Sequence, residues 1–147
     1  FLNPPDMPTA LRDFCLATRQ PAPRTQGELV RCARESLALM YREVCHSLEE
    51  LSGEHIEVIH IVGGGSKDQL LNQMTADACQ RPVVAGPVEA TALGNLLTQV
   101  RADGELDSLA EMRAVVAKSN PVQHFTPANA NEWEDAADRF ARLRQFK

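Results

Sequence analysis

The stretch that decides the fold runs from Ile56 to Cys79 and reads IEVIHIV-GGGS-KDQLLNQMTADAC. In its first part, Ile56–Val62, β-branched residues fall on both faces of an extended chain, as in a strand inside a covered parallel sheet. Residues 63–66 are three glycines and a serine, which suit a tight turn. From Lys67 to Cys79 the apolar residues recur at helical spacing. We therefore predict a strand, a glycine turn and a helix in this order.

The same pattern repeats once downstream. Val83–Ala85 reads as a short second strand, Gly86–Val88 as a turn and Glu89–Arg101 as an Ala/Leu-rich helix. A strand–helix–strand–helix unit implies two parallel strands that are joined by a right-handed crossover.

Helices flank this unit on both sides. Upstream, Pro8–Thr18 reads as a short helix, and Thr25 with Glu28 forms a capping box. That box starts a long helix whose apolar stripe runs from Leu29 to Leu51 and ends at Ser52-Gly53.

Downstream, Ser108 with Glu111 predicts a helix that extends to about Lys118. Residues 120–129 read as a loop, and Asn131 with Glu134 is expected to cap a last helix.

Composition limits the classes of function. A chain of 147 residues is long enough for one ordinary domain. Its net charge of −5 and scattered basic residues argue against partners such as nucleic acid or a membrane surface. No apolar run approaches the roughly 20 residues of a membrane span. The first residue, Phe1, is not Met, and we expect the chain to be a piece of a longer cytoplasmic protein.

The cysteines Cys15, Cys32, Cys45 and Cys79 lack the paired spacing of a metal site. Cys15 and Cys32 lie on neighbouring predicted helices and could approach each other, either as free thiols or as a disulfide.

The glycine turn is the candidate ligand site. Consecutive glycines let a ligand approach the backbone without meeting a Cβ atom, and the following helix directs free N–H groups at the turn. Such a turn suits the ribose or α-phosphate of a nucleotide, although it equally suits a plain tight connection. It lacks the G-K-S/T ending of a P-loop and the spacing of a dinucleotide turn.

Two linked blocks carry a resemblance to a known family. Residues 61–79 resemble the adenosine motif of the FGGY carbohydrate kinases, and residues 86–95, GPVEATALGN, resemble the segment that follows it in that family. The likeness extends over nearly the whole chain. Within the family, His60–Gly65 and Gly86–Ala90 resemble the branch that phosphorylates L-rhamnulose.

The resemblance implies an α/β fold: part of the C-terminal domain of an actin-like (ribonuclease-H-like) ATPase, helix-rich, with a short parallel sheet that lacks its first three strands. Residues 1–147 would be the C-terminal nucleotide-binding domain of a two-domain kinase, with ATP or ADP between the domains and Mg²⁺ bound by the full-length enzyme. The catalytic base and most sugar contacts would come from the N-terminal domain, so we assign no catalytic and no metal-binding residue here.

For the nucleotide, the resemblance places Gly64 against the ligand, with Gly63, Gly65 and Ser66 completing the turn. Asp68 takes the position that often contacts the adenine, where related kinases commonly have Asn. A carboxylate accepts a hydrogen bond from the exocyclic amine but offers no amide donor. Lys67 is a candidate for a phosphate contact. The alternative is that its side chain is simply solvated in the first turn of the helix.

Three functions remain open: an L-rhamnulose kinase, a kinase of another sugar such as xylulose or glycerol, and a non-catalytic nucleotide-binding or interaction module. In the actin-like fold, three strands precede the long helix, and the first pairs with the strand equivalent to Ile56–Val62. We expect this chain to cover that strand's open edge by self-association or by its own N-terminal segment.

Overall fold

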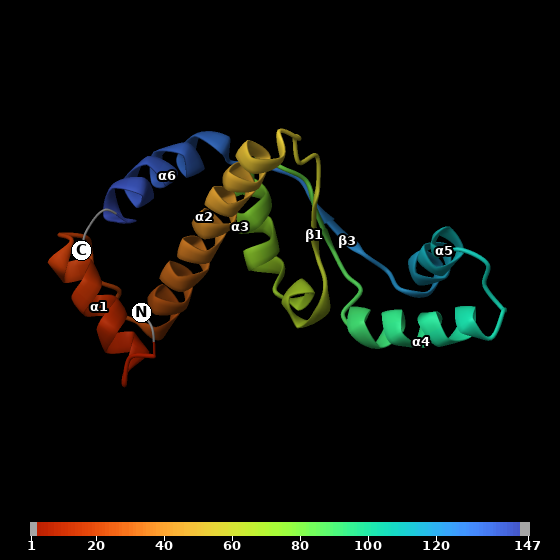
Figure 1. Ribbon diagram of the computed structural model, residues 1–147. Coiled ribbons are helices and arrows are strands. Elements are labelled where there is room, and N and C mark those ends of the chain that lie inside the picture. Colours follow the sequence, from red (N-terminus) through yellow and green to blue (C-terminus); the bar gives the residue numbers. More distant parts are fainter. Residues whose placement is uncertain (1–2, 145–147) are drawn as a thin grey trace.

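The computed structural model describes residues 3–144 (Figure 1). The helices are α1 (Met7–Ala17), α2 (Gln26–Ser52), α3 (Gln69–Cys79), α4 (Ala90–Ala102), α5 (Leu109–Ser119) and α6 (Ala130–Arg144). The strands are β1 (Ile59–Ile61), β2 (Val83–Ala85) and β3 (Gln123–Phe125), and a 3₁₀ turn, η1, spans Gly63–Lys67. The predicted helix-rich α/β architecture is confirmed.

Local signals fix the long helix α2. The Thr25 hydroxyl accepts a hydrogen bond from the backbone N–H of Glu28 at 3.2 Å, and the Glu28 carboxylate accepts the N–H of Thr25 at 3.2 Å and that of Arg24 at 2.6 Å. These backbone donors, with that of Arg24 first, lower the pKa of Glu28. At the other end, Gly53 adopts the left-handed conformation (φ 70°) that terminates a helix.

The sheet is mixed and has the order β1-β2-β3. β1 runs parallel to β2, with Ile59 opposite Val83, as the crossover pattern predicts. β3 pairs antiparallel with the other side of β2, with Phe125 opposite Val83. The residues expected to form a loop between α5 and α6 therefore contain a strand.

Small side chains let α2 and α3 pack closely. Ala38 of α2 and Ala78 of α3 are fully buried and form a core cluster with Met74, against which Leu71 and Trp133 pack. Trp133 belongs to α6, so this cluster joins three helices.

Polar contacts fix the chain after β3 onto α3. The buried carboxylate of Asp77 accepts hydrogen bonds from Gln73 Nε2 at 2.9 Å and from the backbone N–H of Ala128 at 2.8 Å. Gln73 also donates to the carbonyl of Thr126 at 2.9 Å. Asp77 therefore has a structural role, with a partner from a distant part of the sequence.

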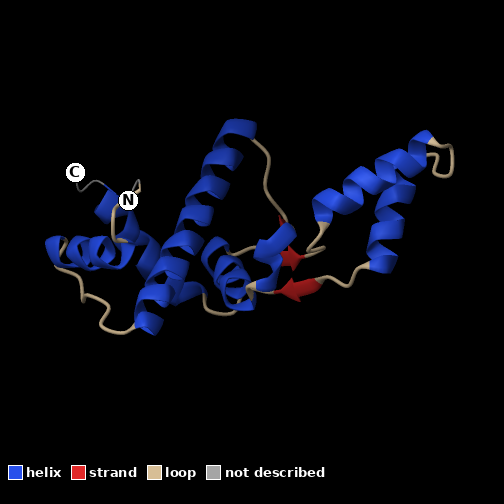
Figure 2. Cartoon of the chain, turned by 90° about the horizontal axis from the view of Figure 1, so that it is seen from below, coloured by secondary structure: helices blue, strands red, loops and turns tan. Residues whose placement is uncertain are grey.

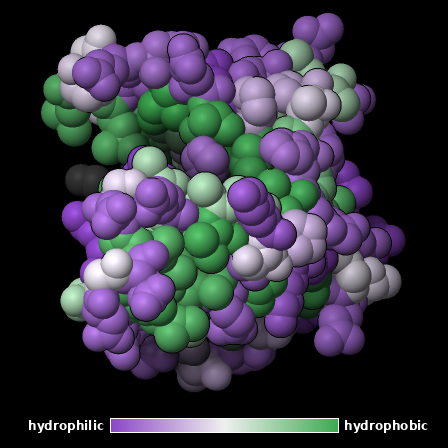
Figure 3. All heavy atoms as spheres, turned by 90° about the vertical axis from the view of Figure 1, so that its right-hand side faces the viewer, coloured by the Kyte–Doolittle hydropathy of each residue, from purple (hydrophilic) through white to green (hydrophobic). Residues whose placement is uncertain are grey.

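The molecule is elongated. In Figure 1, α1, α2, α3 and α6 lie on one side of the sheet strands, and α4 and α5 form a separate pair on the other side, which Figure 2 shows from below. Seen from the side of α4 and α5, hydrophobic residues gather in patches at the surface (Figure 3).

Several predicted boundaries are wrong. The strand predicted over Ile56–Val62 is limited to Ile59–Ile61, because its partner β2 is equally short and follows Pro82, which has no N–H to continue the ladder. The helix predicted from Lys67 begins at Gln69, with Asp68 as its N-cap.

One predicted cap also differs. Asn131 lies inside α6, which already begins at Ala130.

The N-terminal segment does not cover the open edge of β1. Among residues 3–144, β1 pairs only with β2, and α1 lies on the far side of α2 (Figure 1).

Candidate functional site

The glycine turn lies at the carboxyl end of β1. Gly63 has a φ of +76°, in the left-handed region that side chains rarely adopt. The Ser66 hydroxyl donates to the carbonyl of Gly63 at 2.7 Å, and the N–H of Asp68 donates to the carbonyl of Gly65 at 3.1 Å. The turn is therefore closed by its own hydrogen bonds.

The two motif blocks of the sequence meet at this point. The N–H of Gly63 donates to the carbonyl of Pro87 at 2.9 Å, and the N–H of Gly86 donates to the carbonyl of Ile61 at 2.8 Å. Both blocks follow parallel strands, β1 and β2, at the same edge of the sheet. In open α/β sheets, ligands bind outside the carboxyl ends of the strands.

The three glycines differ in what surrounds them. A Cβ atom at Gly63 would lie 3.8 Å from the carbonyl of Val88, and one at Gly65 would lie 3.7 Å from Ile61 Cγ2. A Cβ atom at Gly64 would meet no protein atom within 4 Å, and Gly64 is exposed. The open side of the turn is therefore at Gly64, where a ligand can lie directly against the backbone.

Asp68 links the turn to α2. One of its carboxylate oxygens, Oδ1, caps α3 by accepting the N–H of Leu71 at 3.2 Å. The other, Oδ2, accepts from Arg34 Nε at 2.8 Å in a partly exposed ion pair. Each oxygen can accept a second hydrogen bond, so Asp68 can still receive a donor from a ligand.

Arg34 is the residue that sequence reasoning missed. It lies 34 positions before Asp68, on a different helix, and reaches the turn because α2 packs against α3. Among residues 3–144, its η nitrogens make no hydrogen bond or ion pair, so they remain available to an anion. No local signal in the sequence singles out Arg34 from its neighbours Arg31 and Arg42.

The other predicted residues have distinct positions. Ser66 is 6% exposed, and its hydroxyl is engaged within the turn, so it stiffens the loop. Lys67 is exposed, and within residues 3–144 it forms no ion pair. Beneath the turn, the buried Asn72 donates from Nδ2 to the carbonyl of Ser66 at 3.0 Å.

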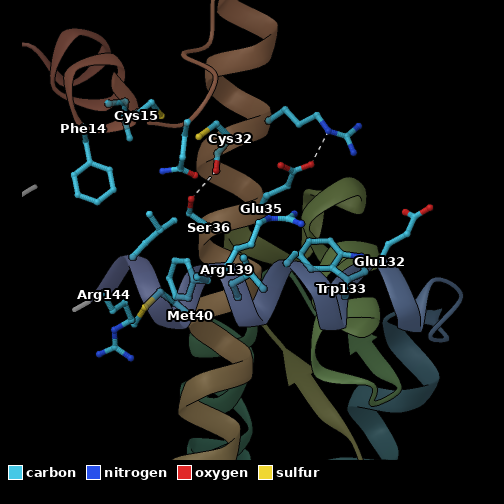
Figure 4. A pocket seen from close by; sticks show the side chains of 17 residues that line it. Phe14, Cys15, Cys32, Glu35, Ser36, Met40, Glu132, Trp133, Arg139 and Arg144 are labelled. Atoms are coloured by element: carbon cyan, nitrogen blue, oxygen red, sulfur yellow. Dashed lines mark hydrogen bonds and ion pairs between the residues drawn. The ribbon is translucent and has the colours of Figure 1, made fainter. Parts of the chain in front are cut away.

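A separate cavity of about 580 Å³ lies among α1, α2 and α6, away from the glycine turn (Figure 4). Phe14 projects toward it from α1, Met40 from α2 and Trp133 from α6. It is lined by Leu11, Phe14, Cys15, Gln20, Arg31, Cys32, Glu35, Ser36, Leu39, Met40, Glu132, Trp133, Ala136, Arg139, Phe140, Leu143 and Arg144. Neither motif block contributes a residue to it.

The thiols lie in pairs and are free. Cys15 and Cys32 are close enough to hydrogen-bond, as their predicted proximity requires, and no disulfide joins them. Burial raises the pKa of Cys32, and the neighbouring Cys15 raises it further. Burial and the neighbouring Cys45 raise the pKa of Cys79 to about 12. Cys32 and Cys79 therefore stay protonated at neutral pH, which does not suit a nucleophile.

Other classes of site are not seen in the described part of the chain. Within residues 3–144, His, Cys, Asp and Glu side chains nowhere gather in groups of three that could hold a metal ion. Among the helices of the same range, none combines the length and hydrophobicity that a bilayer span requires.

Comparison with known proteins gives a consistent set of similarities. Residues 1–103 match the profile of the FGGY family of carbohydrate kinases, C-terminal domain. The chain is 46% identical over 140 residues to the rhamnulokinase of Bacteroides thetaiotaomicron, covering 95% of this chain and 29% of that protein. It is 45% identical over 145 residues to the rhamnulokinase of Pectobacterium atrosepticum, covering 99% of this chain and 29% of that protein.

A solved structure, that of xylulose kinase from Rhodospirillum rubrum, superimposes with a TM-score of 0.59 at 25% identity. The superposition covers 82% of this chain and 24% of the kinase. The chain thus spans less than a third of the length of each of these relatives.

Proposed function

We propose, because the chain belongs to the FGGY family of carbohydrate kinases, that it is the nucleotide-binding part of an ATP-dependent kinase that phosphorylates L-rhamnulose. Residues 1–147 would act as one domain, together with an N-terminal domain of the same polypeptide. The 45–46% identity to rhamnulokinases supports this choice of sugar.

The observation that carries the nucleotide site is the open backbone at Gly64. The turn around it is held by internal hydrogen bonds, and no protein atom occupies the place of a Cβ atom there. A flat or bulky group such as adenosine can therefore lie against the peptide without displacing a side chain. Asp68 closes the turn, and Arg34 forms an ion pair with it, so these two residues present an acceptor and a donor at the end of the turn.

Adenosine would lie against Gly63–Ser66, with its exocyclic amine within reach of the Asp68 carboxylate. Free η nitrogens of Arg34 and the ammonium of Lys67 would face the ribose and phosphates. Phosphoryl transfer depends mainly on positioning and charge stabilisation. In this proposal the chain contributes positioning, and the catalytic base and the sugar contacts lie in the other domain.

Mg²⁺ would be bound by the full-length enzyme, and we assign no metal ligand to this chain. A reducing compartment fits the free cysteines, and we assign the protein to the cytoplasm.

Titration of ADP into the chain, followed by amide chemical shifts, tests the site. We expect shifts at Gly63–Asp68 with millimolar affinity, because the other wall of the cleft is absent. If these amides stay still while those around the 580 Å³ cavity shift, the proposed site is wrong.

One alternative is a kinase of another sugar, which the structural similarity to xylulose kinase favours. Phosphorylation assays of the intact kinase that carries these residues, with L-rhamnulose, D-xylulose and glycerol, separate the two. ADP binding without phosphorylation of any sugar would instead support a non-catalytic nucleotide-binding module.

A further inference from the structure

The cavity among α1, α2 and α6 is large enough to hold a small molecule. Its volume of about 580 Å³ lies within the range of roughly 300–1,000 Å³ that is typical of small-molecule sites. None of the residues that line it belongs to the glycine turn or to the second motif block. The cavity is therefore separate from the proposed nucleotide site.

Aromatic rings form much of its wall. Phe14 projects toward it from α1 (Figure 4), and Trp133 and Phe140 lie about two turns apart on α6, so they are on the same face of that helix. Leu39 and Met40 of α2 add further apolar surface. Because aromatic rings prefer offset stacking and edge-to-face contacts with other rings, this wall favours a ligand with a flat aromatic body.

One arginine in the wall has no partner. Arg31 pairs with Glu35 at 2.7 Å, and Arg144 pairs with Glu43 of α2. Arg139 projects from α6 toward α2 (Figure 4), and among residues 3–144 it forms no hydrogen bond or ion pair. Its guanidinium therefore keeps its N–H donors available, and their geometry matches a carboxylate or a similar oxyanion.

The balance of charge in the wall also favours an anion. Arg31, Arg139 and Arg144 line the cavity together with two glutamates, Glu35 and Glu132, so positive charges exceed negative ones there. The whole chain, in contrast, has a net charge of −5. The cavity is thus a local positive region on a chain that otherwise repels anions.

We propose that this cavity binds a small organic anion with an aromatic body, such as an aromatic carboxylate. The rings of Phe14, Trp133 and Phe140 contact the aromatic body, and Arg139 binds the anionic group. The inference does not rest on the proposed function, because it uses no residue of the glycine turn.

Two fluorescent probes test the proposal on this chain. Anilinonaphthalenesulfonate and phenylnaphthylamine share an aromatic body, and only the first carries a negative charge. Trp133 is the single tryptophan of the chain, so energy transfer from it to either probe reports binding at the cavity. We expect both probes to bind saturably at one site, and the sulfonate to bind more tightly.

A substitution of the unpaired arginine tests the recognition of charge. Arg139→Gln should raise the dissociation constant of the sulfonate about fivefold, as expected for a partly solvated ion pair, and leave that of the uncharged amine unchanged. The matched control is Arg142→Gln, at an arginine of α6 that does not line the cavity; it should change neither constant. Both arginines are exposed, so circular dichroism of the two variants should equal that of the wild type.

A second substitution tests the location. Ala136 lines the cavity from α6, and Ala136→Phe would place a ring in the space that the ligand needs. Both dissociation constants should rise at least about tenfold. The proposal is overturned if neither probe binds saturably, or if Arg139→Gln and Arg142→Gln have equal effects on the sulfonate. It is also overturned if a folded Ala136→Phe variant binds both probes as the wild type does.

ADP separates this cavity from the nucleotide site. Excess ADP should leave the sulfonate bound, because the two ligands occupy different places. Displacement of the sulfonate by ADP, with no amide shifts at Gly63–Asp68, would make the cavity the nucleotide site and overturn its assignment as a second one. Probe binding that follows the predicted pattern while ADP shifts no amide of Gly63–Asp68 would refute the nucleotide site alone.

Discussion

Replacing Gly64 by alanine separates the requirements of the fold from those of the ligand. In the folded chain the added methyl group would meet no atom within 4 Å, and the backbone of Gly64 is outside the left-handed region. Gly→Ala at such a compatible position reduces the entropy of the unfolded chain and stabilises a protein by about 0.4–1 kcal/mol. We therefore expect the free energy of unfolding of Gly64→Ala to be equal to or above that of the wild type.

The nucleotide should respond in the opposite direction. If adenosine lies against the Gly64 backbone, the new methyl group occupies space that the ligand needs. Adding a methyl group to a well-packed contact costs about 1–3 kcal/mol. That corresponds to a dissociation constant for ADP about 5- to 150-fold higher.

Amide chemical shifts measure this change even when binding is weak. Far below saturation, the initial slope of shift against ADP concentration is inversely proportional to the dissociation constant. The control is Gly65→Ala, because its methyl group would contact Ile61 Cγ2 at 3.7 Å rather than the open side. Equal slopes for the two variants would refute the reasoning, since a ligand on the open side must distinguish them.

Three further predictions concern stability. Asp68→Ala should lower the free energy of unfolding by about 1–2 kcal/mol in urea titrations, since it removes a helix cap and the ion pair with Arg34. Asp68→Asn keeps the cap and should lower the free energy of unfolding by less than about 1 kcal/mol. Asp77→Ala should cost about 1.5–3 kcal/mol, because the charged acceptor of the Ala128 N–H is lost. In the folded chain the pKa of Cys79 is about 12, above its ordinary value of 9.0, so the unfolded thiol ionises at lower pH than the folded one. The free energy of unfolding should therefore fall as pH rises from 9 toward 12. A Cys79→Ala variant whose free energy of unfolding falls equally steeply over this pH range would contradict the prediction.

The starts of α2 and α5 and the end of α2 were predictable because their causes are local. The capping box at Thr25 involves atoms only three residues apart in sequence, and Ser108 caps α5 through Glu111 in the same way. The stop at Gly53 depends on the conformation of one residue. Such signals do not need the rest of the fold.

Strand boundaries were not predictable, because each depends on a partner far away. Gln123–Phe125 has no alternating apolar pattern, and it becomes a strand because the free side of β2 accepts it. Conversely, the β-branched run Ile56–Val62 predicts a longer strand than forms, since a ladder ends where its partner ends.

The candidate site also combines features with local causes and features that depend on distant residues. Its glycines and Asp68 follow from a contiguous motif, whereas Arg34 is brought to it by the packing of Ala38 against α3. Whether an arginine on α2 reaches the turn depends on how α2 is rotated about its axis and how closely it packs against α3. A linear sequence does not specify either of these.

The hydrogen bonds within the turn also determine which groups remain for a ligand. The Ser66 hydroxyl is engaged with Gly63, and both Asp68 oxygens already accept one donor. Among the described residues, the groups that remain include bare backbone at Gly64, one further acceptor position on each Asp68 oxygen, the η nitrogens of Arg34 and the ammonium of Lys67. A site of this composition selects a ligand by its flatness and close fit to the peptide more than by many side-chain contacts. That makes Gly64, which carries no functional group, the position whose substitution is most informative.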